Sequence, residues 1–377
     1  MNYVSADMRV GEDGTCIWDL QSSRLLSSPI GSSMRGITTA IAWIIRSDDA
    51  EEGLVFGTND GFLCIWKREK AGYFIEVTCE RLEGGPDGLE ISGIAYDTST
   101  GQLAVVQRSQ SVHRFIVDVS MRLVVVKSVQ IPQHWPQAVC FGQTGFGGPE
   151  IWSFGREDGI IHVLNDAGKV VKSKMTGTVI GHAAMNVKED TLIIDDVSQG
   201  VAVFKLSTTD RLRTFNVPLA TRRLRSVAFH DGNSAIISGS DHGKIYIFDR
   251  RTGDVIDTID IGIKDWVQSV ASTERNGVPL IFIGRSGGNV VGKNEVQLWE
   301  KILVPLIKEE GRTRKGFQEE VLAVMCLLSV LFVLENVLVR KLHHVQGVLD
   351  DFNHREYRYL IISVMGLRGS FRKCTLT

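Results

Sequence analysis

The sequence predicts an all-β protein, a seven-bladed β-propeller whose first blade is incomplete. Short hairpins, each built of two strands around a turn, recur along most of the chain at a nearly even spacing. The turns lie at positions 14, 61, 111, 159, 200, 243 and 287, so the gaps between them are 47, 50, 48, 41, 43 and 44 residues. A repeat of about 40–45 residues is typical of propeller blades, four-stranded sheets that must stack on their neighbours to bury their faces.

The clearest hairpin lies in residues 234–249. Two runs of β-branched, aromatic and small residues, Ala235–Ser238 and Lys244–Phe248, flank the turn-forming cluster Gly239–Gly243. Because Gly and Asp tolerate the backbone angles that close a hairpin, this pattern predicts a strand, a tight turn and a second strand. The other copies have the same order, for example Asp60-Gly61 followed by a strand that ends at Trp66.

These repeats resemble those of the WD40-repeat family. Trp18-Asp19 matches the dipeptide that names the family, and Phe248-Asp249 and Trp299-Glu300 are degraded versions of it. The resemblance covers roughly residues 1–308 and implies a WD40-like propeller. It implies little about function beyond an interaction scaffold, because one fold serves many roles.

The strands can be assigned blade by blade. In the first blade Met8–Gly11, Thr15–Trp18 and Leu25–Ser28 supply three strands; the fourth comes from a later segment, or the sequence is truncated. The next six blades open with inner strands at Ile37–Trp43, Ile91–Tyr96, Ala138–Phe141, Thr178–Ile180, Arg225–Phe229 and Val267–Ala271. In the last blade Lys301–Ile307 is the candidate outer strand. We expect it to pair near Met8–Gly11 or to remain a frayed edge, because an open blade exposes unpaired backbone groups.

The character of the chain changes after the propeller, which is predicted to span residues 1–308. Residues 309–320 form a polar linker, residues 321–339 are hydrophobic, and residues 340–377 form a C-terminal tail. The hydrophobic span approaches the roughly 20 residues that a helix needs to cross a bilayer. We therefore expect Val321–Val339 to be a transmembrane helix that anchors the propeller on the cytosolic side of a membrane. The alternative, favoured by Glu335 within the span, is a cytoplasmic protein whose hydrophobic tail packs on the propeller.

Charge and cysteine content limit which classes of partner and which cellular compartments fit the sequence. The net charge is −2; ten Lys or Arg and six Asp or Glu follow position 310, so the tail carries +4 and the propeller −6. An acidic propeller is a poor nucleic-acid binder, because phosphate contacts need a basic surface. The six cysteines have no CxxC or metal-like spacing, and no signal peptide is recognisable, so we expect reduced core cysteines.

No catalytic, cofactor or metal site is predicted, so we expect no enzyme. Gly287–Lys293 fits the phosphate-loop pattern G-x-x-x-x-G-K, but Asn294 replaces the required Ser or Thr and a strand follows instead of a helix. Gly181-His182 is similar to the Gly-His of the WD40 family, where the ring hydrogen-bonds within the blade. The spacing of Ser, His and Asp residues indicates no catalytic set.

Residues at equivalent positions before the inner strands of different blades predict a candidate binding face. Four residues before the leading Ile or Val of five of these strands stand Ile37, Glu90, Trp135, Arg223 and Trp266. The resemblance places this end of each inner strand near the central opening, where partners dock. Large aromatic residues and Arg anchor protein interfaces; the alternative is that Trp135 and Trp266 pack between blades. The sequence thus predicts a non-catalytic scaffold that binds other proteins.

Overall fold

The computed structural model of the protein describes residues 3–4, 17–19, 24–26, 35–46, 52–69, 73–84, 88–145, 148–262, 266–286, 296–303 and 369–374. Strands and turns account for the secondary structure of these residues. The propeller unit comprises Met1–Lys301 and Phe371–Thr377, and Ile302–Ser370 form a separate unit.

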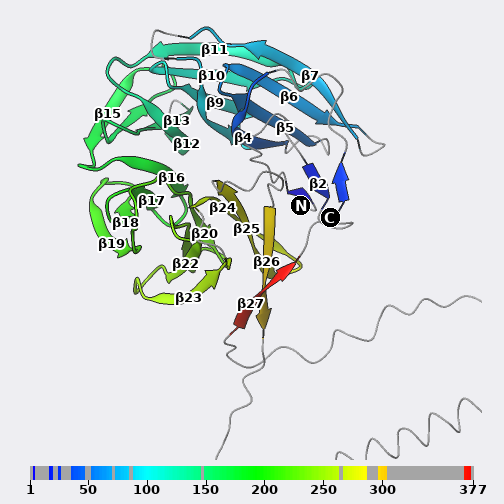
Figure 1. Cartoon of the computed structure of the whole chain (residues 1–377). Coiled ribbons are helices and arrows are strands. Elements are labelled where there is room, and N and C mark those ends of the chain that lie inside the picture. The colour runs from blue at the N-terminus through cyan, green and yellow to red at the C-terminus, as the bar shows by residue number, and fades with distance from the viewer. Residues whose placement is uncertain are drawn as a thin grey trace, which may run out of the picture. The chain divides into compact units, whose positions relative to one another are not determined.

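Six antiparallel sheets of four strands each form the blades of a propeller (Figure 1). In each blade the strands pair in chain order, so the first is the inner strand and the fourth the outer one. The first three blades are β4 (Thr38–Ile45), β5 (Glu52–Thr58), β6 (Phe62–Arg68) and β7 (Phe74–Arg81); β8 (Ile91–Asp97), β9 (Gln102–Gln107), β10 (Ser111–Val117) and β11 (Leu123–Gln130); and β12 (Pro136–Gly145), β13 (Gly148–Gly155), β14 (Ile160–Leu164) and β15 (Val170–Met175).

The other three blades repeat this pattern. They are β16 (Ile180–Asn186), β17 (Thr191–Asp196), β18 (Gly200–Lys205) and β19 (Arg211–Asn216); β20 (Val227–His230), β21 (Ala235–Ser238), β22 (Lys244–Asp249) and β23 (Val255–Asp260); and β24 (Trp266–Arg275), β25 (Val278–Ser286), β26 (Val296–Leu303) and β27 (Gly369–Cys374). The inner strands contact one another in succession, from β4 through β8, β12, β16 and β20 to β24. The all-β propeller prediction is therefore confirmed.

Apolar side chains fill the spaces between neighbouring blades. Between the β4–β7 and β8–β11 blades, for example, Val55 and Leu63 pack with Val105 and Phe115. Similar clusters occupy the other spaces between successive blades. The aromatic residues that close the predicted hairpins, such as Trp66 and Phe248, are almost completely buried. A blade thus buries both faces only by stacking on its neighbours.

The turns explain the recurring glycines of the sequence. Gly61 and Gly243, between the second and third strands of their blades, have φ angles of +82° and +81°. A residue with a Cβ is strained in this left-handed conformation, so Gly is favoured there. A β-bulge also recurs between the third and fourth strands of five blades. Bulges twist an outer strand and make it a poorer template for pairing with another chain.

The number of blades differs from the prediction: the structure has six, not seven. The predicted turn at Asp13-Gly14 lies outside the described residues, and the strands before and after it form a sheet of only three strands, β1 (Tyr3–Val4), β2 (Ile17–Asp19) and β3 (Arg24–Leu26). Ile17 of this sheet packs with Leu54 and Phe56 of the first blade. The spacing of the turns predicts the number of hairpins and not the number of complete four-stranded blades. The first predicted hairpin belongs to this three-stranded sheet. The predicted strand Met8–Gly11 lies outside the described residues.

The outer strand of the last blade was also predicted wrongly. Residues 301–303, expected to begin a separate strand, continue β26, and β27 from the predicted tail takes the outer position. Residues 304–307 are outside the described part of the chain, as are the linker 309–320 and the hydrophobic span Val321–Val339. Among the residues that the structure does describe, no helix is long and apolar enough to span a membrane.

Candidate functional site

A central cavity of about 540 Å³ lies where the six inner strands meet. Its lining comes from the beginnings of these strands and from residues that follow the second strands, such as Arg108 and Arg156. Most of the side chains are polar or charged, which distinguishes the cavity from the apolar layers between blades. The cavity is therefore the place where this fold exposes polar chemistry inside the propeller.

A bulge near the start of the inner strand explains the polar lining. In five blades the pairing between the first and second strands shifts, and one residue, or two in β16, remains unpaired on the inner strand. Such bulges re-aim side chains, and these residues all line the cavity: Thr39, Ser92, Gln137, His182 and Gln268. Arg225 contributes from the segment before β20. Each blade thus supplies one polar residue to a ring of six.

Several members of this ring join one blade to the next. The Thr39 hydroxyl donates to the backbone oxygen of Ile91 at 2.6 Å, and the Ser92 hydroxyl donates to that of Pro136 at 2.6 Å. His182 accepts a longer hydrogen bond, 3.5 Å, from the backbone N–H of Val227 through Nδ1. The expected Gly-His contact within a blade is thus replaced by a contact between blades. These bonds give the ring a structural role.

An ion-pair network forms one side of the cavity mouth. The Arg108 guanidinium lies 3.5 Å from Glu90 and 3.6 Å from Glu157, and it donates to Gln137 Oε1 at 2.7 Å. Arg156 pairs with the same Glu157 at 3.1 Å. Two arginines and two glutamates therefore compensate one another on this side.

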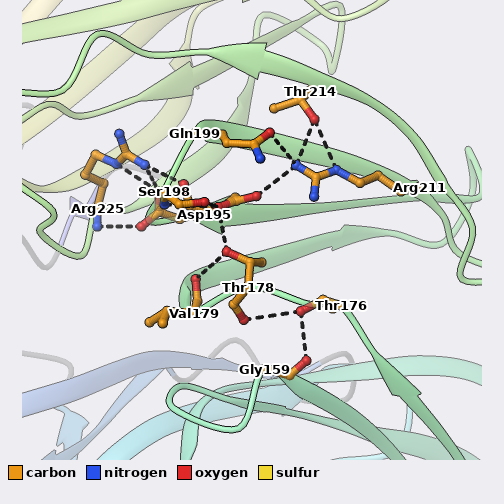
Figure 2. A network of polar contacts seen from close by, with 11 residues as sticks. Gly159, Thr176, Thr178, Val179, Asp195, Ser198, Gln199, Arg211, Thr214 and Arg225 are labelled. Atoms are coloured by element: carbon orange, nitrogen blue, oxygen red, sulfur yellow. Dashed lines mark hydrogen bonds and ion pairs between the residues drawn. The ribbon is translucent and has the colours of Figure 1, made fainter.

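A buried ion pair on the opposite side joins β17 to the segment before β20 (Figure 2). Both side chains are fully buried; Arg225 Nη2 lies 2.7 Å from Asp195 Oδ1, and the Arg225 backbone N–H donates to Oδ2 at 2.7 Å. Burial raises the pKa of Asp195 to about 6, against the opposing effect of the Arg225 charge. The carboxylate is therefore mainly ionised at pH 7, and the pair is charged.

The neighbouring Asp196 extends this polar network through a second arginine. Its carboxylate accepts from Arg211 at 2.8 Å and from the hydroxyls of Thr178 and Ser198. Figure 2 shows Arg211 also directed at Gln199 and Thr214. The contacts fix the turn after β17, so both arginines serve the architecture of this blade.

Among the described residues, two side-chain clusters have the composition of a metal site. In the first, Cys64, Glu76 and Cys79 lie together, but Cys64 and Cys79 form a disulfide, contrary to the expectation of reduced cysteines. Cys140 is free, as expected. In the second, His134, Asp158 and His162 lie together. Both ring nitrogens of His134 already have protein partners, so metal binding there would have to displace hydrogen bonds.

The structure assembles a Ser–His–Asp set that the sequence spacing did not reveal. His134 Nδ1 lies 2.7 Å from Asp158, and its Nε2 lies 2.8 Å from the Ser153 hydroxyl. This connectivity is that of a catalytic triad. However, Ser153 and His134 are completely buried, and a nucleophile must be reachable by its substrate. The trio therefore acts as a hydrogen-bonded support inside the β12–β15 blade.

The five predicted binding residues are partly brought together. Ile37, Glu90 and Trp266 line the cavity. Trp135 is half-buried, and its backbone oxygen accepts from Arg156 N–H. Arg223 is exposed and stacks over Trp266, with its guanidinium carbon 5.2 Å from the ring centroid.

The sequence reasoning missed the deeper residues of the cavity. The same alignment contained their signal, because Thr39, Ser92, Gln137, Arg225 and Gln268 all stand two residues before the leading Ile or Val. Asp195 had no such signal, since its role depends on contact between two blades. The phosphate-loop pattern at Gly287–Lys293 lies outside the described residues.

Comparison with known proteins adds no relatives. No protein-family model matches the chain, and the search of curated proteins found no significant match. The WD40 resemblance therefore rests on the repeats and the propeller fold.

Proposed function

We propose that the protein is a non-catalytic scaffold that binds other proteins at the mouth of the central cavity. The observation that carries this proposal is the Arg223–Trp266 pair at the rim. The Trp266 indole is half-buried, and its Nε1 donates to the Leu224 backbone oxygen at 2.8 Å, so the ring is fixed before any partner binds. A fixed aromatic ring and a stacked arginine are the groups that anchor protein interfaces at low entropic cost.

The proposal of a non-catalytic role is supported by the contacts of the polar groups in and near the cavity, which bond to structural partners. The hydroxyls of Thr39 and Ser92 bond to backbone oxygens, and Arg225 is paired with Asp195. The Ser153–His134–Asp158 trio is enclosed in its blade. Each of these groups has a structural partner, which leaves the rim for recognition.

Alanine variants at the rim test the proposal. Affinity purification of the full chain with mass spectrometry identifies partners, and calorimetry then measures their affinity for each variant. Arg223→Ala should weaken binding by at least about 2 kcal/mol, with an unchanged melting temperature because Arg223 is exposed. Trp266→Ala and Trp135→Ala should also lose binding. If they instead lower stability and keep every partner, these tryptophans serve packing between blades and the docking face lies elsewhere.

The proposal includes attachment to a membrane through Val321–Val339, with the propeller on the cytosolic side. Its support is the hydrophobic composition of that span. The full chain should then resist carbonate extraction, and deletion of residues 316–340 should release it. Leu331→Arg should weaken insertion by roughly 2.5–3.5 kcal/mol. Recovery of the full chain in the carbonate supernatant would favour the cytoplasmic alternative with a packed tail.

A further inference from the structure

Two exposed arginines stand beside the mouth of the central cavity. Arg222 and Arg223 lie in Ala220–Arg225, a segment between β19 and β20 that we call the arginine loop. Arg223 stacks on Trp266, and Trp266 lines the cavity. The rim between the last two blades therefore carries Arg223, with Arg222 next to it in the chain.

The arginine loop is held in place at both ends. At its start, Asp241 accepts hydrogen bonds from the Ala220 backbone N–H at 2.9 Å and from the backbone N–H and hydroxyl of Thr221. At its end, Arg225 is fixed by the buried pair with Asp195. Because both ends are fixed, a ligand of the two exposed arginines meets a largely pre-organised loop, which reduces the entropic cost of binding.

The charges of this loop differ from those on the other side of the mouth. Arg108 and Arg156 are compensated by Glu90 and Glu157, and Arg225 by Asp195. Within the described part of the chain, no carboxylate forms an ion pair with Arg222 or Arg223. These two positive charges thus stand on a part of the chain, residues 1–310, whose net charge is −6 with both arginines included.

Stacking also determines how Arg223 can bind. The guanidinium is planar by itself, and with Trp266 beside one face its outer edge can donate two parallel hydrogen bonds to a carboxylate or phosphate. Lysine has no such planar fork. The chemistry that complements the arginine loop is therefore a planar or tetrahedral anion.

We propose that the arginine loop and Trp266 bind an anionic side chain, a carboxylate or a phosphate, carried by a peptide segment of the partner. This inference rests on the proposed function, since it names the chemistry of the partner at that same rim. Arg223 donates the paired hydrogen bonds, Arg222 adds a second charge, and Trp266 holds Arg223 in orientation. The binding is electrostatic in part and weakens as salt rises.

Short fluorescein-labelled peptides test the inference by fluorescence anisotropy on the full chain. One carries alternating Gly and Glu, a second carries phosphoserine in place of Glu, and a third carries Gln in place of Glu. We expect at least one anionic peptide to bind about tenfold more tightly than the Gln peptide. Whichever of the two binds more tightly identifies the source of the anion. Equal binding of all three peptides overturns the inference.

Matched variants locate the binding. Arg223→Gln and Arg222→Gln should each weaken the anionic peptide about tenfold. Arg251→Gln is the control, because Arg251 is also exposed but lies in the turn between β22 and β23, at the opposite end of that blade. An equal loss in Arg251→Gln would mean non-specific attraction and would overturn the inference. Unchanged melting temperatures show that the variants are folded.

The inference and the proposed function fail in different ways. If Trp266→Ala and Arg223→Ala lose natural partners but no anionic peptide is preferred, the docking face stands and its anionic specificity is wrong. If Arg223-dependent peptide binding is measured but every natural partner is retained by those variants, the anion site stands and the docking face is wrong.

Discussion

At the scale of single residues, position 181 requires a glycine because a side chain from another strand fills the space that a Cβ would occupy. A Cβ at this position would lie 2.0 Å from Asp195 Oδ2, and the carboxylate is held there by Arg225. Gly181→Ala should therefore disrupt the buried ion pair and lower the free energy of unfolding by about 3–5 kcal/mol, the cost typical of breaking such a pair. Urea unfolding measures it.

Gly284→Ala provides the matched control for this variant. A Cβ at position 284, also in a strand, would come no closer than 3.2 Å to Ser269 Cβ. A much smaller loss is expected, because a shift of a few tenths of an ångström relieves the contact. Equal losses in the two variants would show that the Asp195–Arg225 pair is not what Gly181 protects.

A second prediction at this scale concerns pH. Burial lowers the pKa of His113 from 6.5 to about 4, while its ring is hydrogen-bonded to Ser128 and Gln107. Because the unfolded chain binds the proton more readily, the stability that the neutral ring contributes is complete above about pH 6.5 and is lost as the pH falls towards 4. The effect amounts to up to about 3 kcal/mol.

Chemical unfolding at several pH values between 7.5 and 4 checks this prediction. His113→Gln removes the titrating group, so the variant should lose less stability than the wild type over that range. Identical pH dependence in both proteins would mean that folding does not lower the pKa of His113.

At the scale of elements, β27 closes the last blade from a distant part of the chain. It pairs beside β26 although residues 304–368 separate the two strands in sequence. A chain that ends at Arg368 should leave the outer side of β26 unpaired, and amide hydrogen exchange of Val296–Leu303 should accelerate. Exchange of Gln102–Gln107, in another blade, should not change.

Removal of residues 375–377 alone is the control for that truncation, because it spares β27. Unaltered exchange of β26 in the longer truncation would show that the β26–β27 pairing contributes no protection. General acceleration in every blade would instead show that the sixth blade is needed for the whole propeller.

The same element shows where sequence reasoning reaches its limit. Strands within a repeat were predictable, since alternating apolar residues and turn glycines mark each hairpin locally, as at Gly243. The outer strand of the last blade was not, because no local pattern in Gly369–Cys374 records its distant partner β26. The Arg225–Asp195 pair escaped prediction for the same reason. In contrast, the phase of the inner strands did locate the rim residues Glu90 and Trp266 at the cavity.

At the scale of the whole molecule, the ring of polar residues links the blades where their inner strands meet. The Thr39 hydroxyl links β4 to β8, and the Ser92 hydroxyl links β8 to β12. The Arg225–Asp195 pair links β17 of the fourth blade to the segment before β20, the inner strand of the fifth blade. Apolar layers provide most of the stacking energy, but they are non-directional. The directional bonds at the centre therefore help to fix how each blade is oriented against its neighbour.

The order of β26, the hydrophobic span and β27 along the chain constrains any attachment to a membrane. Val321–Val339 lies between the two strands in sequence, and both strands belong to one sheet. A single crossing by this span would leave β26 and β27 on opposite sides of the bilayer, where they could not pair. If the propeller keeps β27, the chain must therefore return to the side from which it left.

This constraint yields a prediction about topology. In sealed vesicles that contain the full chain, epitope tags at the two ends should be on the same side and should be digested together by added protease. The deletion of residues 316–340 provides a control for tag accessibility in a chain without the hydrophobic span. A protected tag at one end and a digested tag at the other would demonstrate a single crossing. In that case the membrane-bound protein could not contain the β26–β27 pair, and its last blade would have to be completed by another strand or remain open at its outer edge.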